Sequence, residues 1–115
     1  PKDFTPGCTI EAENFRDDYE AFKKSGAVVL GVSVDGVKSH KAFSKKLGSK
    51  LEAQELPFSL LSDSDGEVAK RYGVMGWIMA KRVTYIIGKS GKVRRIFEDV
   101  KPDTHSKLIL KYLGV

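Results

Sequence analysis

The chain has 115 residues, of which 41% are hydrophobic and 30% charged, and its formal net charge is +5. This length and mixture indicate one globular domain, residues 1–115, and exclude a disordered chain. No apolar run approaches the roughly 18–20 residues of a membrane helix, so we expect no membrane partner. Basic residues are interspersed with acidic ones and form no aromatic-studded stripe, which favours a solvated surface over a nucleic-acid interface, although a basic binding module stays possible.

A single cysteine, Cys8, excludes an intramolecular disulfide within these residues. One cysteine and the lack of an apolar leader segment are typical of a protein from a reducing compartment, so we expect a cytoplasmic location. The chain starts at Pro1 rather than at a methionine. Such a start indicates a processed or incomplete product.

The first predicted element is a helix from Thr5 to about Lys24. Thr5 is a candidate N-cap whose hydroxyl can accept hydrogen bonds, and the proline that follows suits the first helical position. Ser25-Gly26 is a helix-ending pair. Apolar residues recur at helical spacing between these ends. They are Cys8, Ala12, Phe15, Tyr19 and Phe22.

The remaining chain alternates strands and helices, which indicates an α/β sheet covered by helices. The β-branched run at 28–34 predicts a strand that is buried on both faces. Residues 88–91 predict a tight turn that joins two strands into an antiparallel hairpin. In chain order the predicted elements are a strand at 28–34, a helix at 39–47, a strand at 58–61, a helix capped by Ser64 and ending at Tyr72, strands at 83–87 and 92–97, and a helix at 103–113.

Cys8 is the first candidate for chemistry, because it falls in the first turn of a predicted helix. Unpaired N–H groups and the helix dipole favour an anion there. Lowering a thiol pKa from about 8.5 to about 6 takes roughly 3.4 kcal/mol, whereas a helix end supplies about 2 kcal/mol at most. A nearby cation is therefore needed, and spacing alone does not choose it. From its place on the apolar stripe alone, Cys8 would more often be a packing residue.

The segment Pro1-Lys-Asp-Phe-Thr-Pro-Gly-Cys8 matches the active-site pattern P-x-x-x-T-x-x-C of peroxiredoxins. Gly31-Val-Ser-Val-Asp35, Tyr72-Gly-Val74 and Arg82-Val-Thr-Tyr-Ile-Ile-Gly88 are similar to the bacterioferritin-comigratory protein, or peroxiredoxin Q, subfamily. The resemblance runs nearly end to end. It implies a thioredoxin-like α/β fold with a central mixed sheet flanked by helices, in which an N-terminal hairpin and a central strand would precede Pro1.

The resemblance also implies a set of site residues. Cys8 would be the peroxidatic nucleophile, Thr5 would hydrogen-bond the thiolate and the peroxide, and Pro1 would shield the sulfur. Arg82 would be the missing cation, since a guanidinium is always charged and offers forked donors. Glu11 would orient Arg82. No metal, haem or flavin is implied.

The implied activity is reduction of hydrogen peroxide and organic hydroperoxides through a cysteine sulfenic acid. Many subfamily members carry a second cysteine five residues after the first, where this chain has Glu13. Sulfenic Cys8 would then be reduced by thioredoxin, glutaredoxin or a small thiol. We expect a monomer or weak dimer. A redox sensor or holdase that uses Cys8 without efficient turnover is the alternative, and a disulfide reductase ranks lower because the C-x-x-C pair is absent.

Two further features receive structural interpretations. His40 and His105 show no ligand spacing and are expected at the surface rather than in a metal site. The apolar segment 74–79, which contains Trp77, is expected to pack in the core or beside the active site, with an oligomer contact as the alternative.

Overall fold

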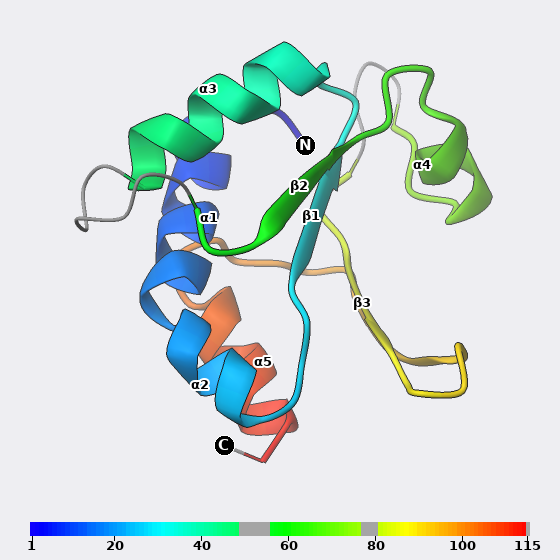
Figure 1. Cartoon of the computed structure of the whole chain (residues 1–115). Coiled ribbons are helices and arrows are strands. Elements are labelled where there is room, and N and C mark those ends of the chain that lie inside the picture. The colour runs from blue at the N-terminus through cyan, green and yellow to red at the C-terminus, as the bar shows by residue number, and fades with distance from the viewer. Residues whose placement is uncertain (49–55, 77–80, 115) are drawn as a thin grey trace.

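A computed structural model describes residues 1–48, 56–76 and 81–114 of the chain. Figure 1 shows helices and strands in nearly the predicted order. They are α1 (Pro6–Asp17), α2 (Tyr19–Lys24), β1 (Leu30–Ser33), α3 (Val37–Gly48), β2 (Ser59–Ser62), α4 (Glu67–Arg71), β3 (Thr84–Ile87), β4 (Val93–Phe97) and α5 (His105–Tyr112).

The first predicted helix is divided at Asp18, so the expectation of one helix to Lys24 is wrong there. Asp18 has φ −94° and ψ 6°, outside helical geometry. Its carboxylate accepts hydrogen bonds from Ser106 Oγ at 2.8 Å and Lys107 Nζ at 2.6 Å. Because both donors belong to α5, a contact between distant parts of the chain fixes the break, and helical periodicity could not predict it.

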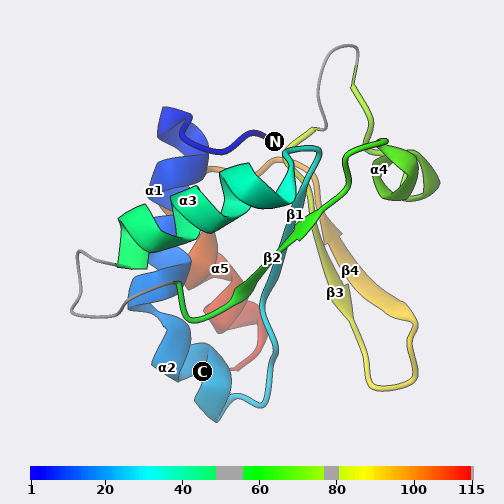
Figure 2. The same ribbon diagram turned by 45° about the horizontal axis from the view of Figure 1, so that its top comes forward.

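The strands form two pairs with the predicted directions. β1 and β2 are parallel, with Leu30 opposite Ser59, whereas β3 and β4 form the expected antiparallel hairpin. Among the described residues these are two separate two-stranded sheets (Figure 2). Both strand directions of a mixed sheet are thus present, and β1 and β3 each keep one unpaired edge within this part of the chain.

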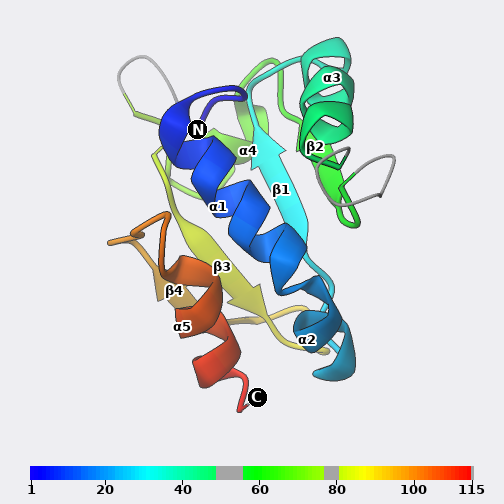
Figure 3. The ribbon, with the colours of Figure 1, turned by 90° about the vertical axis from the view of Figure 1, so that its left-hand side faces the viewer.

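Aromatic and aliphatic side chains from α1, α2 and α5 form the main core. Phe15 and Phe22 stack with their ring centroids 5.1 Å apart and pack with Ile109 and Leu110 of α5. Figure 3 shows α1 and α5 side by side over the strands. Burying each of these side chains stabilises the fold by about 1.5–3 kcal/mol. A smaller cluster of Phe43, Leu47 and Leu56 lies under α3.

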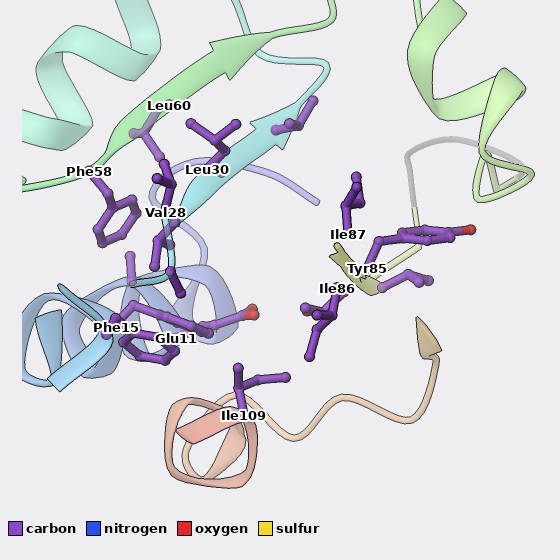
Figure 4. A pocket seen from close by; sticks show the side chains of 18 of the residues that line it. Glu11, Phe15, Val28, Leu30, Phe58, Leu60, Tyr85, Ile86, Ile87 and Ile109 are labelled. Carbon is purple, nitrogen blue, oxygen red and sulfur yellow. The ribbon is translucent and has the colours of Figure 1, made fainter. Parts of the chain in front are cut away.

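A cavity of about 570 Å³ separates the two sheets, and residues 28–33 and 81–89 form two of its walls. We call it the central trough (Figure 4). The expectation that strand 28–34 is buried on both faces is wrong here, since Val28 is 84% exposed and Leu30 57% exposed. The physical reason is that, among the described residues, nothing packs between β1 and β3.

The cap of α4 also differs from the prediction. Its N-cap is Gly66, with φ 70°, and not Ser64. Asp63 supplies the hydrogen bonds instead, because its two carboxylate oxygens accept the N–H groups of Val68 at 3.0 Å and Ala69 at 2.8 Å. Desolvation raises the pKa of Asp63, but these backbone donors lower it further, so the net shift is downward.

Some sequence expectations fall on other parts of the chain. Residues 77–80, which include Trp77, and residues 49–55 lie outside the described residues. Among the helices that are described, none combines the length and the apolar character that crossing a bilayer requires.

Candidate active site

Cys8 is the third residue of α1 and is half-buried. The backbone N–H of Lys2 points at its sulfur, with 3.4 Å between N and Sγ. Thr5 takes the N-cap position, but its side chain makes no capping hydrogen bond, so the predicted capping role of its hydroxyl is wrong. The hydroxyl instead donates to the Lys2 carbonyl at 2.7 Å, which folds residues 2–5 into a turn over the sulfur.

Several neighbours set the charge of the Cys8 sulfur. Burial raises the pKa of the Cys8 thiol, but the Thr5 hydroxyl, the Lys2 amide and the positive amino group of Pro1 lower it by more, so the net pKa is lowered. The contribution of the amino group applies to a chain that begins at Pro1. Because Thr5 has only one hydroxyl hydrogen, its donation to Lys2 and its stabilisation of the thiolate are alternatives. The thiolate form of Cys8 is therefore more populated than that of an ordinary cysteine at the same pH.

Arg82 lies just before β3 and faces α1. Its Nη1 donates to Glu11 Oε2 at 2.5 Å, and the two side chains are only 21% and 20% exposed. Burial lowers the pKa of Arg82, but Glu11 and the Cys8 thiolate raise it by more. Glu11 follows Cys8 by three residues and thus lies on the same side of α1. The guanidinium therefore interacts with both a structural carboxylate and the sulfur.

Gly7 lets the Arg82 guanidinium come close to the start of α1, and sequence reasoning missed this residue. A Cβ atom at Gly7 would lie 2.7 Å from Arg82 Nη2 and 3.4 Å from Arg82 Cζ, so the guanidinium rests against the bare backbone of the first helical turn. The available signal was a glycine in a predicted helix next to the nucleophile, where glycine costs about 1 kcal/mol relative to alanine.

Pro1, Cys8, Glu11 and Arg82 all line the central trough. A thiolate and an always-charged guanidinium thus share one partly enclosed site with helix N–H groups. Such a site suits attack by sulfur on an electrophile whose leaving atom gains negative charge, because fixed donors stabilise that charge best where water is excluded.

Residues 1–96 match the family model described as the AhpC/TSA family. The chain belongs to the AhpC/TSA family. This AhpC/TSA chain is 44% identical over 117 residues to the chloroplastic peroxiredoxin Q of Sedum lineare, covering 98% of the chain and 59% of that relative. It is also 44% identical to the chloroplastic peroxiredoxin Q of Arabidopsis thaliana, of which it covers 51%. The chain thus spans between half and three-fifths of the length of these relatives.

Solved structures agree with this family assignment. The bacterioferritin comigratory protein of Xanthomonas campestris is 34% identical, with a TM-score of 0.88 over 99% of this chain and 73% of that one. Peroxidoxin BcpB from Mycobacterium tuberculosis is 32% identical, with a TM-score of 0.86 over the same shares. The predicted thioredoxin-like fold and the predicted resemblance to peroxiredoxin Q are confirmed.

The surface positions expected for both histidines of this AhpC/TSA chain are wrong, since His40 is 5% exposed and His105 is 1% exposed. His40 precedes Phe43 and Leu47 by three and seven residues, so it shares the inner face of α3. His105 similarly precedes Ile109 by one helical turn on α5. The periodicity of these helices was the overlooked signal.

The loop that leads to Cys8 is strained at one residue. Phe4 has φ 62°, which is rare for a bulky side chain and costs about 1–3 kcal/mol. Its ring packs edge-on against Phe43 of α3, with the ring centroids 5.1 Å apart, and Lys46 Nζ lies 5.5 Å from its centre. Such a conformation persists only where surrounding contacts hold it, and here α3 supplies them.

Proposed function

We propose that this chain carries the site of a thiol-dependent peroxidase in which Cys8 attacks the peroxide. The observation that supports this most directly is the placement of the Arg82 guanidinium against Gly7, next to a half-buried cysteine whose pKa is lowered. The helix end alone supplies too little energy to ionise the thiol, and we assign Arg82 a share of the difference beside the Thr5 hydroxyl, the Lys2 amide and the amino group of Pro1. Family membership supports the same activity.

The proposed reaction has two stages. The Cys8 thiolate attacks one peroxide oxygen, so that an S–O bond forms, the O–O bond breaks, and the departing oxygen takes up a proton to leave as water or an alcohol. Cys8 becomes sulfenic acid and the peroxide is reduced. An external thiol then displaces water to form a mixed disulfide, and a second thiol releases Cys8 and leaves as a disulfide.

Each site residue has a proposed part in this reaction. Arg82 and the first-turn N–H groups stabilise negative charge on the departing oxygen. Glu11 holds Arg82, Thr5 donates to the sulfur or to the peroxide, and Pro1 shields the sulfur from water.

The proposal also covers the substrate, the reductant and the location of the protein. The Xanthomonas protein is described by its alkyl peroxide reduction activity, so we propose alkyl hydroperoxides as well as hydrogen peroxide. Cys8 is the only cysteine in these 115 residues, which favours thioredoxin, glutaredoxin or a small thiol as reductant. The cytoplasmic location stays a prediction, and the plant relatives are named as chloroplastic.

Peroxide consumption with thioredoxin and its reductase tests the proposal. We expect repeated turnover by the unchanged chain, none by Cys8→Ser, and a rate lower by about 10²-fold in Arg82→Gln, as for loss of one preorganised donor. Dimedone labelling followed by mass spectrometry should detect the sulfenic acid only when Cys8 is present. Equal turnover in Cys8→Ser would contradict the proposal. A single oxidation without turnover, with every reductant tried, would favour a redox sensor.

A further inference from the structure

We propose that Asp3 and His40 form a positioning pair that holds residues 1–5 over the Cys8 sulfur. We call these residues the active-site loop. Neither side chain of the pair makes a hydrogen bond to the sulfur, so both act through the backbone of the loop. The inference deepens the proposed peroxidase function and rests on it for its catalytic consequence.

The first observation is a buried cluster that joins the loop to α3. Asp3 Oδ2 accepts hydrogen bonds from His40 Nδ1 at 2.7 Å and Ser39 Oγ at 2.8 Å. Asp3 is 8% exposed and His40 is 5% exposed. Ser39 and His40 belong to the first turn of α3, where the helix dipole also favours a carboxylate. Asp3 is therefore bound to the end of a helix that follows the loop by more than thirty residues.

The hydrogen-bond pattern fixes the protons on His40. On its far side, Nε2 faces the Leu61 carbonyl oxygen at 3.0 Å and Ser33 Oγ at 3.4 Å. The Ser33 hydroxyl gives its hydrogen to Asp35 at 2.7 Å, so it offers only lone pairs to the ring. Nε2 must donate to these acceptors, and Nδ1 must share a hydrogen with the Asp3 carboxyl. His40 thus connects the active-site loop, through Nδ1, to β2, through Nε2.

A second anchor acts on the backbone of the same residue. The N–H of Asp3 donates to Asp35 Oδ2 at 2.8 Å, and Asp35 follows the end of β1. One carboxylate oxygen of each acid and one nitrogen of His40 lie within 4.8 Å of one another, which is close enough to hold a cation. The oxygen of each acid already accepts two hydrogen bonds, and both His40 nitrogens have partners. The arrangement is thus explained without a ligand.

The connection to the reacting sulfur runs through neighbouring residues. Lys2 comes directly before Asp3, and its N–H contacts the Cys8 sulfur. Phe4 comes directly after Asp3 and has the strained φ of 62°. When Asp3 is released, this strain favours relaxation of the loop, and the Lys2 amide then moves away from the sulfur. That amide lowers the pKa of Cys8, so its loss favours the unreactive thiol.

Two substitutions of His40 test the pair, because each keeps a hydrogen-bonding group at the position of only one ring nitrogen. His40→Asn places an amide N–H near the Nδ1 position and can still donate to Asp3, whereas His40→Gln reaches the Nε2 position and can donate only toward Leu61. We expect His40→Gln to raise the pKa of Cys8 and slow its reaction with hydrogen peroxide by about tenfold, the effect of losing one hydrogen bond. His40→Asn should stay within about threefold of the unchanged chain.

The measurements separate positioning from folding and from the proposed function. The pH dependence of iodoacetamide alkylation gives the pKa of Cys8 without any peroxide, and urea midpoints show whether each variant folds. Lys41→Gln, on an exposed position of α3, is the matched control and should match the unchanged chain in every measurement. Asp3→Ala, which removes the carboxylate that Ser39 and His40 contact, should reproduce the effect of His40→Gln.

The outcomes are distinct. A wild-type Cys8 pKa and rate in His40→Gln or in Asp3→Ala, or equal damage in His40→Asn and His40→Gln, would overturn the positioning role. A shifted Cys8 pKa in a chain that never turns over peroxide would support the positioning role and refute the peroxidase.

Discussion

Burial alone would keep the Cys8 sulfur protonated, so its reactivity depends on the donors that reach it. Thr5 and Lys2 belong to the active-site loop, whereas Arg82 comes from the far side of the central trough. Arg82 reaches the helix because Gly7 has no side chain. At the residue scale, the close approach of Arg82 thus depends on the absence of a Cβ atom at Gly7 as well as on the charged groups.

Gly7→Ala should slow the reaction of Cys8 with peroxide without destabilising the fold. The added Cβ would lie 2.7 Å from Arg82 Nη2, so the guanidinium must shift away from the first turn of α1. We expect the rate of Cys8 with hydrogen peroxide, measured by stopped flow, to fall about tenfold, since displacing a donor costs less than the 10²–10³-fold effect of removing it. The urea midpoint should stay or rise, because alanine favours helix over glycine by about 1 kcal/mol.

Gly36→Ala is the matched control, because a Cβ at Gly36 meets no atom within 4 Å. Its rate should equal that of the unchanged chain. An unchanged rate in Gly7→Ala would show that Arg82 does not need this close contact.

At the element scale, His105 joins α5 to β3. Its Nε2 lies 2.8 Å from Thr84 Oγ1, and its Nδ1 is buried with no partner among the described residues. Desolvation lowers the pKa of His105, Glu11 opposes this, and Arg82 adds to the lowering. A histidine whose pKa is lowered in the folded state stabilises the fold fully above its ordinary pKa near 6.5, and this stability is lost as the pH falls below that value.

His105→Gln should weaken the acid sensitivity of the fold. Glutamine can keep the contact with Thr84 at the Nε2 position but cannot titrate. Between about pH 6.5 and pH 5, the free energy of unfolding of the unchanged chain should fall more steeply than that of His105→Gln, by at most about 1.4 kcal/mol per pH unit. Urea titrations at several pH values measure both slopes. Parallel slopes would mean that His105 does not contribute to acid unfolding.

Periodicity predicted most elements because local spacing controls them. The spacing of Phe15 and Phe22 reflects a helix face that is buried, and the turn at 88–91 joins two strands as expected. Some predictions failed because distant residues decide the outcome. Asp18 interrupts its helix through contacts with α5. The cap of α4 failed for a local reason, because Asp63 and Ser64 are adjacent candidates and only the structure shows that the Asp63 carboxylate reaches the two backbone N–H groups.

The candidate site follows the same division. Cys8, Thr5 and Arg82 were predicted from motifs, since their types and order are visible in the sequence. The roles proposed for Gly7 and His40 depend on what stands opposite them in space, and no local pattern contains that information. A glycine beside the nucleophile and a histidine in phase with Phe43 and Leu47 were the only signals.

At the scale of the whole molecule, the central trough leaves the edges of β1 and β3 unpaired within the described residues. Unpaired strand edges bearing exposed apolar side chains favour strand addition from another chain. Val28 and Leu30 are such side chains on the β1 wall (Figure 4). An extended segment that hydrogen-bonds to both edges would remove this tendency.

We therefore predict that the 115-residue chain associates as its concentration rises. Sedimentation velocity should show a larger average mass at higher concentration. Leu30→Lys should reduce this association without lowering the urea midpoint, because Leu30 is 57% exposed and its replacement removes little buried area. Equal monomer sedimentation of both chains at all concentrations would contradict the prediction.

The position of α5 has a practical consequence for truncation. The match to the family model ends at residue 96, whereas α5 spans His105–Tyr112. Ile109 and Leu110 nevertheless complete the cluster that buries Phe15 and Phe22. A carboxypeptidase that removed the residues after 96 would therefore expose the rings of Phe15 and Phe22 to solvent. The range matched by the family model and the residues that form the core therefore end at different positions in this molecule.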